Sequence, residues 1–237
     1  MKKHLLIFSI AILMSLSVSS QSNIGIIMGG GVSDFRIKTD SVEFDKEINK
    51  EELNFRLIYQ AGINFENIII ERQLYLQFGL HMKSSGFSAH NDSVGNYFHN
   101  IHIPLEMKYK YFFNKRGDAY LYASGGPYFA ASFKGIQYDK YAVDNFLNDT
   151  EGYTKMYSPL LKLGKSDTDD IMAFDYGANI GVGFGYSNFQ IGYNFGLGIA
   201  NMIPKAWLET EEGEEPSTFI LRNGYHTLTL GFYFSNE

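Results

Sequence analysis

Residues 176–199 read YGANIGVGFGYSNFQIGYNFGLGI, and this stretch decides the fold. Apolar or aromatic residues occupy every second position from Tyr176 to Tyr186, and the alternation resumes from Phe189 to Ile199 after Ser187-Asn188. A period of two is typical of a strand with two different faces, and so short a connection predicts a β-hairpin. Each half is longer than the usual globular strand and matches the roughly 9–11 residues that cross a membrane at a tilt.

The same alternation predicts further strands on both sides of this hairpin. Together with it they give about eight strands, an even number, as in bacterial single-chain barrels. We therefore expect an all-β fold, a transmembrane antiparallel up-and-down β-barrel. The further strands are expected at Ile24–Asp34, Phe55–Phe65, Leu74–Met82, Ile101–Phe113, Ala119–Phe133 and His226–Phe234.

The connections between these strands alternate in length. A soluble β-sandwich has no reason to sort its connections in this way, whereas outer-membrane barrels have short periplasmic turns and long extracellular loops. The alternation therefore predicts an outer-membrane barrel with both chain ends in the periplasm. The expected short connections are Glu66–Gln73, Asn114–Asp118 and Ser187–Asn188, and the long ones are Arg36–Asn54, Ser88–Tyr97, Lys134–Phe174 and Ala200–Asn223.

The first residues have the pattern of a cleavable signal peptide. A basic start, Met1–His4, precedes an apolar run, Leu5–Leu16, that is too short to span a bilayer, and Val18-Ser19-Ser20 supplies small residues for cleavage. The alternative is an uncleaved membrane anchor. We expect a signal peptide over residues 1–20 and one barrel domain over 21–237.

Composition excludes several other classes of protein. The chain has no cysteine, which excludes a lipid-anchored lipoprotein and any disulfide framework. After the N-terminal segment no run of about twenty apolar residues occurs, so a helical membrane protein is excluded. The formal charge of −6 gives no support for nucleic-acid binding.

The residues between the lipid-facing positions should point into the barrel. A barrel of about eight strands is only wide enough to be filled by side chains, so these groups must satisfy one another. We expect a buried polar network in which Glu106 is surrounded by cations, and a plugged lumen. The alternative is a narrow ion path. The predicted network consists of Arg56, His81, Lys83, His102, Glu106, Lys108 and Lys110.

Aromatic residues near the strand ends are expected to form girdles at the two membrane interfaces. Their alternative role is ordinary hydrophobic packing within the strands. The residues concerned are Tyr109, Tyr111, Phe112, Phe113, Tyr120, Tyr122 and Tyr186.

No motif predicts a catalytic, cofactor or metal site. The glycines of residues 181–185 lie within a strand and open no helix, so they are no dinucleotide-binding motif. The carboxylates of 166–170 lack the glycine and distal glutamate of a helical calcium loop, so a solvated acidic loop is favoured. The acidic run 209–215 is interpreted as a solvated face, and the alternative is that it binds cations that bridge lipopolysaccharide. The histidines His99, His102 and His226 stand near no recognisable nucleophile motif.

Three stretches carry a resemblance to a known family. They are Ile101–Tyr111 continued by Ala119–Tyr128, then Asp175–Phe184, and finally Thr227–Phe234. They resemble the PorT-like outer-membrane β-barrel family of Bacteroidota, often labelled porin-family proteins. The resemblance spans nearly all of the mature chain and implies a fold rather than an activity. It also implies that the barrel-assembly machinery recognises the terminal aromatic strand, although Ser235-Asn236-Glu237 follow its last aromatic residue here.

These observations lead to a functional expectation. We expect a non-enzymatic integral outer-membrane protein that has a structural, recognition or accessory role through long extracellular loops. The alternatives are a narrow passive pore and, less favoured, a lipid-modifying outer-membrane enzyme. The expected partners are outer-membrane lipid and lipopolysaccharide, the barrel-assembly machinery and an envelope protein complex, with no cofactor and no nucleic acid.

Overall fold

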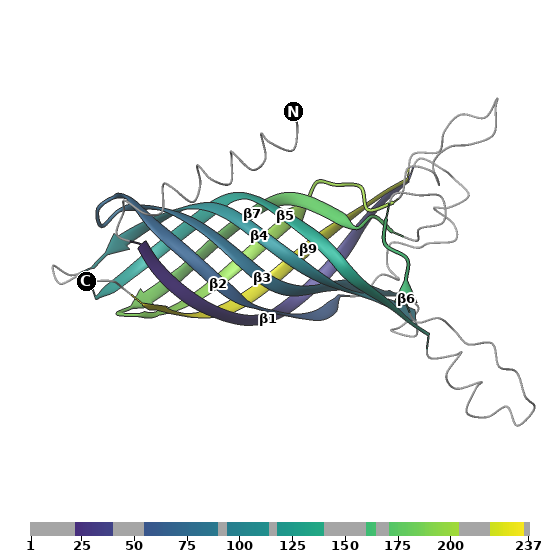
Figure 1. Cartoon of the computed structure of the whole chain (residues 1–237), viewed down its shortest axis with the longest axis horizontal. Coiled ribbons are helices and arrows are strands. Elements are labelled where there is room, and N and C mark those ends of the chain that lie inside the picture. The colour runs from purple at the N-terminus through teal and green to yellow at the C-terminus, as the bar shows by residue number, and fades with distance from the viewer. Residues whose placement is uncertain are drawn as a thin grey trace, which may run out of the picture.

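The computed structural model describes residues 22–39, 55–89, 94–113, 118–139, 160–164, 171–203 and 219–234. These residues form nine strands joined by turns and irregular segments (Figure 1). The strands are β1 (Ser22–Thr39), β2 (Arg56–Ile70), β3 (Leu74–Ala89), β4 (Val94–Phe112), β5 (Ala119–Asp139), β6 (Leu160–Leu161), β7 (Phe174–Tyr186), β8 (Phe189–Gly198) and β9 (Phe219–Phe234).

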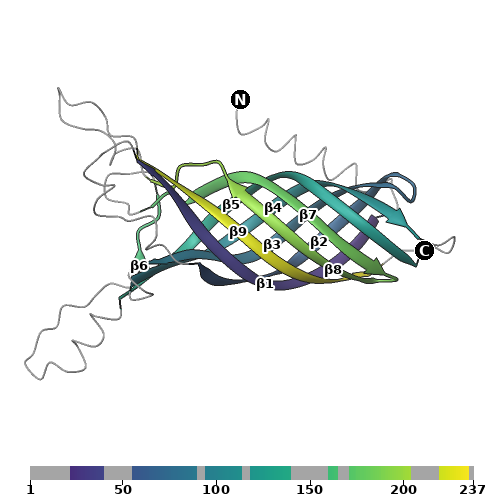
Figure 2. The ribbon, with the colours of Figure 1, turned by 180° about the vertical axis from the view of Figure 1, so that it is seen from behind.

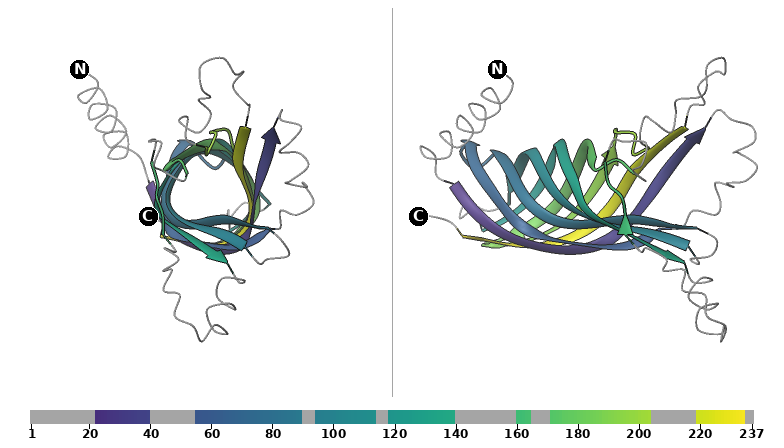
Figure 3. Two further views of the ribbon diagram at one scale, coloured as in Figure 1. Left: turned by 90° about the vertical axis from the view of Figure 1, so that its right-hand side faces the viewer. Right: turned by 45° about the vertical axis from the view of Figure 1, so that its right-hand side comes forward.

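All strands except the two-residue β6 belong to one closed antiparallel barrel. Each long strand pairs with the long strand next to it in the chain, and β1 pairs with β9 to close the ring (Figure 3). Within the closed ring no strand edge is left with free amide and carbonyl groups, which is the condition for a sheet that crosses hydrocarbon. The prediction of an eight-stranded up-and-down barrel is confirmed. The short β6 pairs with the far end of β5.

The two faces of the barrel have opposite polarity. On β7, Ile180 and Val182 point outward and are 61% and 53% exposed, whereas Asn179 between outward neighbours is 5% exposed. The same inversion occurs on β9, where Leu228 is 62% exposed and Thr227 only 1%. An apolar outer surface around a polar interior suits a barrel surrounded by lipid. Among the described residues no helix is long and apolar enough to cross a bilayer.

One end of the barrel carries tight turns. Residues 71–73 join β2 to β3, and 187–188 join β7 to β8. Arg72 and Ser187 adopt positive φ values of 59° and 52° in these turns. The barrel's first and last strands also meet here, because Ile24 pairs with Phe234. At the opposite end, β1 and β9 continue as a paired ribbon beyond the last partner of β2 (Figure 2).

The strand boundaries differ from the prediction mainly at this opposite end. The segment Ser88–Tyr97 was expected to be a long loop, but β3 runs to Ala89 and β4 begins at Val94, so only residues 90–93 separate them. The prediction was wrong because its small and polar residues pair across the hairpin, with Ala89 opposite Val94. Alternation of apolar and polar residues is expected only where a strand contacts lipid, whereas the backbone hydrogen bonds between β3 and β4 continue beyond that part. The predicted signal peptide, 1–20, lies outside the described residues.

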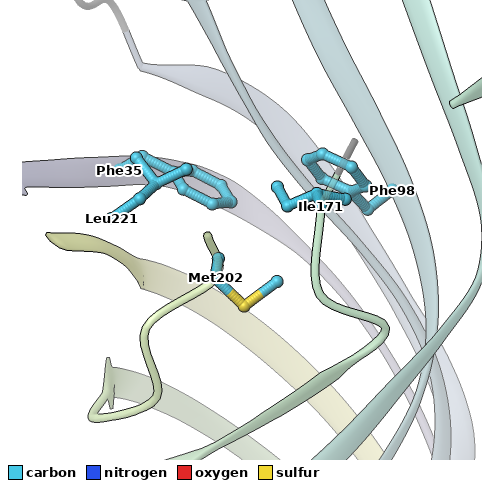
Figure 4. Close-up of a cluster of buried hydrophobic side chains, with 5 residues drawn as sticks. All are labelled: Phe35, Phe98, Ile171, Met202 and Leu221. Carbon is cyan, nitrogen blue, oxygen red and sulfur yellow. The ribbon is translucent and has the colours of Figure 1, made fainter. Parts of the chain in front are cut away.

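An apolar cluster fills the barrel interior at the end opposite the turns (Figure 4). Phe35 and Phe98 point inward from β1 and β4, and both are almost fully buried. The segment around Met202 folds over them, held by hydrogen bonds from the Met202 amide to Leu221 O (2.8 Å) and from the Met172 amide to Met202 O (2.7 Å). We call this set the apolar cap; it consists of Phe35, Phe98, Ile171, Met202 and Leu221.

Candidate functional site

The buried polar interior is the candidate site, and its half nearest the turns is built around Glu66. This carboxylate is 0% exposed and lies between two lysines of β4. Lys108 Nζ is 2.6 Å from Glu66 Oε1, and Lys110 Nζ is 2.5 Å from Glu66 Oε2. Lys108 also donates to Gln190 Oε1 (3.1 Å), whose amide donates to the Tyr120 hydroxyl (2.7 Å). Each buried charge in this cluster therefore has a charged partner.

Aromatic rings offset the excess positive charge of this cluster. One carboxylate faces two ammonium groups, so the cluster carries a formal surplus of one positive charge. Lys110 Nζ lies 4.0 Å from the centroid of the Tyr75 ring, and Lys108 Nζ lies 4.4 Å from that of Tyr122. The negative face of an aromatic ring attracts a cation, more strongly when both are desolvated.

Tyr225 is the centre of a second layer, nearer the apolar cap. Its hydroxyl hydrogen-bonds His102 Nε2 (3.1 Å) and donates to Asn179 Oδ1, and Asn179 donates to Glu106 Oε1 (3.0 Å). Lys83 Nζ lies over the Tyr225 ring. These side chains come from β3, β4, β7 and β9, so the layer spans the whole width of the barrel.

The second layer continues through stacked rings to Asp175. His102 stacks between the ring of His81, at a centroid distance of 5.9 Å, and that of Tyr128, at 4.7 Å. Tyr128 donates to Asp175 Oδ2 (2.9 Å). Among the described residues, Lys83 Nζ has no hydrogen-bond partner and lies over the Tyr225 ring.

The predicted network is thus divided by the structure into separate groups. Lys108 and Lys110 lie together, whereas His81, Lys83, His102 and Glu106 belong to the second layer. Arg56 lies apart from both, with its guanidinium 4.3 Å from the centroid of the Tyr97 ring. The expectation that Glu106 pairs with the cations was wrong: in the described residues Glu66 makes both ion pairs, and Glu106 accepts from Asn179.

Glu66 was missed because its strand was predicted to end at Phe65. Its position in the strand could have identified it. The even-numbered residues of β2 face the interior, and Gln60, Asn64 and Glu66 are all buried. A charged residue followed by Asn67 resembles the start of a turn, but β2 continues to Ile70. The last inward position of a strand is therefore easily assigned to a connection.

Part of the predicted aromatic girdle was also wrong. Tyr109, Tyr111, Phe113 and Tyr186 point outward as expected. Tyr120 and Tyr122 are instead 5% and 8% exposed inside the barrel, and Phe112 packs against Tyr120 with ring centroids 5.1 Å apart. Glycines on β7 and β8 give these rings room. A Cβ added at Gly183 would approach Tyr122 Cζ to 2.5 Å.

Little space remains in the polar interior. The cavity between the two layers has a volume of about 40 Å³ and is lined by side chains that include His81, Glu106 and Lys108. Since a water molecule needs about 10–15 Å³ by this measure, the cavity has room for only a few. No group of three potential metal ligands occurs among the described residues.

The three histidines considered for catalysis are not brought together. His102 is inside, whereas His99 and His226 are on the outer face, where they hydrogen-bond Tyr59 (2.8 Å) and Tyr193 (2.5 Å). Within the described ranges none of them hydrogen-bonds a serine. The acidic segments 166–170 and 209–215 lie outside the described residues.

An eight-stranded closed sheet with an apolar exterior defines a transmembrane β-barrel, the class of protein found in bacterial outer membranes. The family "Outer membrane protein beta-barrel domain" matches residues 16–200. Because the match spans most of the chain, this chain belongs to that family and is an outer-membrane β-barrel protein. A search of curated proteins finds no match.

Several solved outer-membrane proteins are similar to this chain at low identity. The attachment invasion locus protein Ail of Yersinia pestis is 11% identical, with 90% of this chain and 99% of that one covered and a TM-score of 0.39. Neisserial surface protein A is 11% identical, with 89% and 97% covered and a TM-score of 0.41. The N-terminal barrel of Pseudomonas aeruginosa OprF is 12% identical, with 91% and 100% covered and a TM-score of 0.38. Likenesses this distant say nothing about the role of this chain.

Proposed function

We propose that this protein is a sealed, non-catalytic outer-membrane barrel that acts through the segments at the end opposite the turns. The observation that carries this proposal is the filled interior. The two polar layers leave a cavity of only about 40 Å³, and the apolar cap covers them at one end. Barrels of this strand number have an interior that side chains can fill, whereas water-filled channels need about twice as many strands.

The direction of the barrel in the membrane is part of the proposal. Both ends of the sheet lie with the short turns, and the strand ends from which the long connections depart, such as Thr39 and Phe219, lie at the other end. Short turns on the periplasmic side are the rule for such barrels. We therefore place the termini in the periplasm and the long segments outside the cell, where they act in recognition or as an accessory part of an envelope complex. We further propose that the protein is PorT-like, because Thr227–Phe234 and the other motifs quoted above resemble PorT-like proteins.

The runner-up is a narrow pore, because polar groups line the interior continuously from Glu66 to Asp175. The packed layers argue against it. A lipid-modifying enzyme is less favoured because His99, His102 and His226 lie apart and hydrogen-bond tyrosines rather than a nucleophile. Incubating the purified barrel with lipid A tests the enzyme; we expect an unchanged mass spectrum, and a new lipid A species would overturn the non-catalytic proposal.

Conductance across a planar bilayer tests the sealed interior. We expect no steady current at neutral pH from the folded, inserted protein. A water-filled porin of about sixteen strands, inserted in the same bilayer, is the positive control for the current. A steady current from the unchanged protein, at insertion levels equal to those of the control, refutes the seal.

The absence of cysteine makes the direction directly testable. Lys162→Cys places a thiol at the end with the long segments, and Glu71→Cys places one in the turn between β2 and β3; both positions are exposed. In intact cells a membrane-impermeant maleimide should label Cys at 162 and leave 71 unmodified. The reverse pattern would invalidate the proposed direction.

A further inference from the structure

Two arginines face each other on the outside of the barrel. Arg36 of β1 and Arg222 of β9 are direct partners in the strand register. Both side chains are exposed, while their neighbours Phe35, Leu221 and Asn223 are buried, so both arginines point outward. Directly opposed residues on one face of an antiparallel pair have Cβ atoms about 4.5–5.5 Å apart, and like charges at such positions repel. The pair therefore costs stability unless an anion lies between the two guanidiniums.

The described residues around the two arginines supply little to balance this charge. Among the described residues neither guanidinium has a hydrogen bond or an ion pair. The register places Asp34 opposite Gly224, two positions along the ribbon, so the described residues of β1 and β9 contain one acidic residue for the two arginines. The neighbouring residues 199–203 of the chain, Ile-Ala-Asn-Met-Ile, carry no charge. Among the residues that the structure describes at this end of β1 and β9, the two arginines therefore form a positively charged pair.

The pair lies beyond the end of the apolar surface. Along β9, Leu230 and Leu228 are 58% and 62% exposed, and His226 follows, bonded to Tyr193 (2.5 Å), before Arg222 is reached. At about 3.3 Å per residue along a tilted strand, Arg222 lies on the order of 10 Å beyond His226. The polar layer of each leaflet is about 5–7 Å deep, so the backbone of Arg222 lies a few ångströms beyond it and its side chain can reach back into it.

We propose that Arg36 and Arg222 together bind the phosphate group of an outer-leaflet lipid, a phosphorylated glycolipid of the lipid A type. Guanidinium forks bind phosphate oxygens in pairs, and one phosphate between two forks converts their repulsion into attraction. The outward apolar surface of β1 and β9 below the pair, including Met28 and Leu228, receives the acyl chains of the same lipid. An acidic protein partner would use the charges but not this continuous apolar surface. The choice of leaflet rests on the proposed direction of the barrel.

Binding of lipid A to the purified barrel in neutral detergent, followed by native mass spectrometry, tests the site. We expect diphosphorylated lipid A to bind the double variant Arg36→Gln/Arg222→Gln about tenfold more weakly than the unchanged barrel, because two charge-assisted contacts are lost. Arg222→Lys keeps the charge but not the fork and should give an intermediate affinity. Arg72→Gln removes the same charge in a turn at the opposite end and should bind normally.

Four results would overturn the proposal, and three of them concern the lipid. One is equal binding by the double variant, and another is equal binding of dephosphorylated lipid A. The third is inorganic phosphate that competes at the same concentration as the lipid, which would leave the acyl chains without a role. An acidic peptide or protein that binds the pair with lipid A excluded would replace the lipid as occupant and also overturn the proposal.

The binding assay in detergent does not depend on the direction of the barrel or on its seal. Failure of binding with correct labelling at position 162 therefore overturns this inference alone. Labelling at position 71 instead overturns the proposed direction and, with it, the assignment to the outer leaflet. A steady current in the bilayer overturns the seal and leaves the lipid site standing.

Discussion

Gly185 of β7 lies directly opposite Tyr120 of β5, and the tyrosine ring occupies the space that a Cβ atom at position 185 would need. The ring is 5% exposed, and its hydroxyl accepts a hydrogen bond from Gln190 (2.7 Å), which in turn accepts from Lys108 (3.1 Å). The space left by Gly185 therefore accommodates the tyrosine ring that is hydrogen-bonded, through Gln190, to the charged cluster around Glu66. The inward glycines are the complement of the inward tyrosines.

The first prediction concerns this complementarity. Gly185→Ala should lower the free energy of unfolding by about 1–3 kcal/mol, because the added methyl group forces the Tyr120 ring out of place. Urea titration of the barrel in detergent, followed by the shift between folded and unfolded mobility on a gel, measures it. Gly30→Ala is the control, since its Cβ would meet only Ile58 O at an ordinary 3.5 Å. Equal effects of the two substitutions would contradict the prediction.

The second prediction concerns Glu66. Glu66→Gln removes the carboxylate shared by Lys108 and Lys110 and leaves two buried ammonium groups without their ion pair. Removing one partner of a buried pair typically costs about 3–5 kcal/mol, and a loss of this size is expected in the same titration. Glu71→Gln, at an exposed turn position, should have little effect. If both variants unfold at the same urea concentration, Glu66 does not hold the cluster together.

The third prediction concerns the lipid-facing surface. Ile180 lies near the middle of β7 and is 61% exposed, so Ile180→Arg puts a charge into hydrocarbon. The expected cost is about 2–4 kcal/mol when folding is measured in lipid vesicles. Ile69→Arg introduces the same charge at an exposed position beside the turn at 71–73, where the cost should be about 0–1 kcal/mol. A larger loss at position 69 than at 180 would place the membrane elsewhere on the barrel.

The fourth prediction concerns the apolar cap. Phe98 is 0% exposed, and its ring lies 6.0 Å from that of Phe35. Phe98→Ala should cost about 3–5 kcal/mol through the cavity that it leaves. It should still give no steady current, because the layer around Tyr225 closes the barrel beneath the cap. A current from this variant would show that the cap alone seals the interior. Phe133→Ala, on the lipid-facing side and 54% exposed, is the control.

The fold was predictable because lipid and interior impose opposite requirements on successive residues. Ile180 and Asn179 are neighbours in the chain, and their difference in polarity alone indicates a two-faced strand. The alternation of short and long connections between the strands then indicated that the sheet is an outer-membrane barrel. Beyond the lipid-facing part of the strands, successive residues no longer differ in polarity. The prediction therefore placed a loop at Ser88–Tyr97, where β3 and β4 are still paired.

The interior was less predictable for two physical reasons. Tyrosine is compatible with both faces of such a barrel, because its ring suits lipid interfaces and its hydroxyl suits a polar core, so Tyr120 was assigned to the wrong side. Pairing between charges depends on where tilted strands meet across the barrel. Glu66 and Lys108 are 42 residues apart in the chain. The alternation of polarity shows that each faces the interior, but it does not show where each lies along the barrel axis.

The pairing of β1 with β9 also constrains how the protein is made. Sixteen register pairs, from Ile24 with Phe234 to Thr39 with Phe219, join the beginning of the sheet to its end. Until the final strand is synthesised, the opening strand has one row of amides without partners, which lipid would penalise. Insertion therefore has to await the completed polypeptide, and a chain released before residue 219 would remain an open sheet, a substrate for proteolysis rather than a membrane protein.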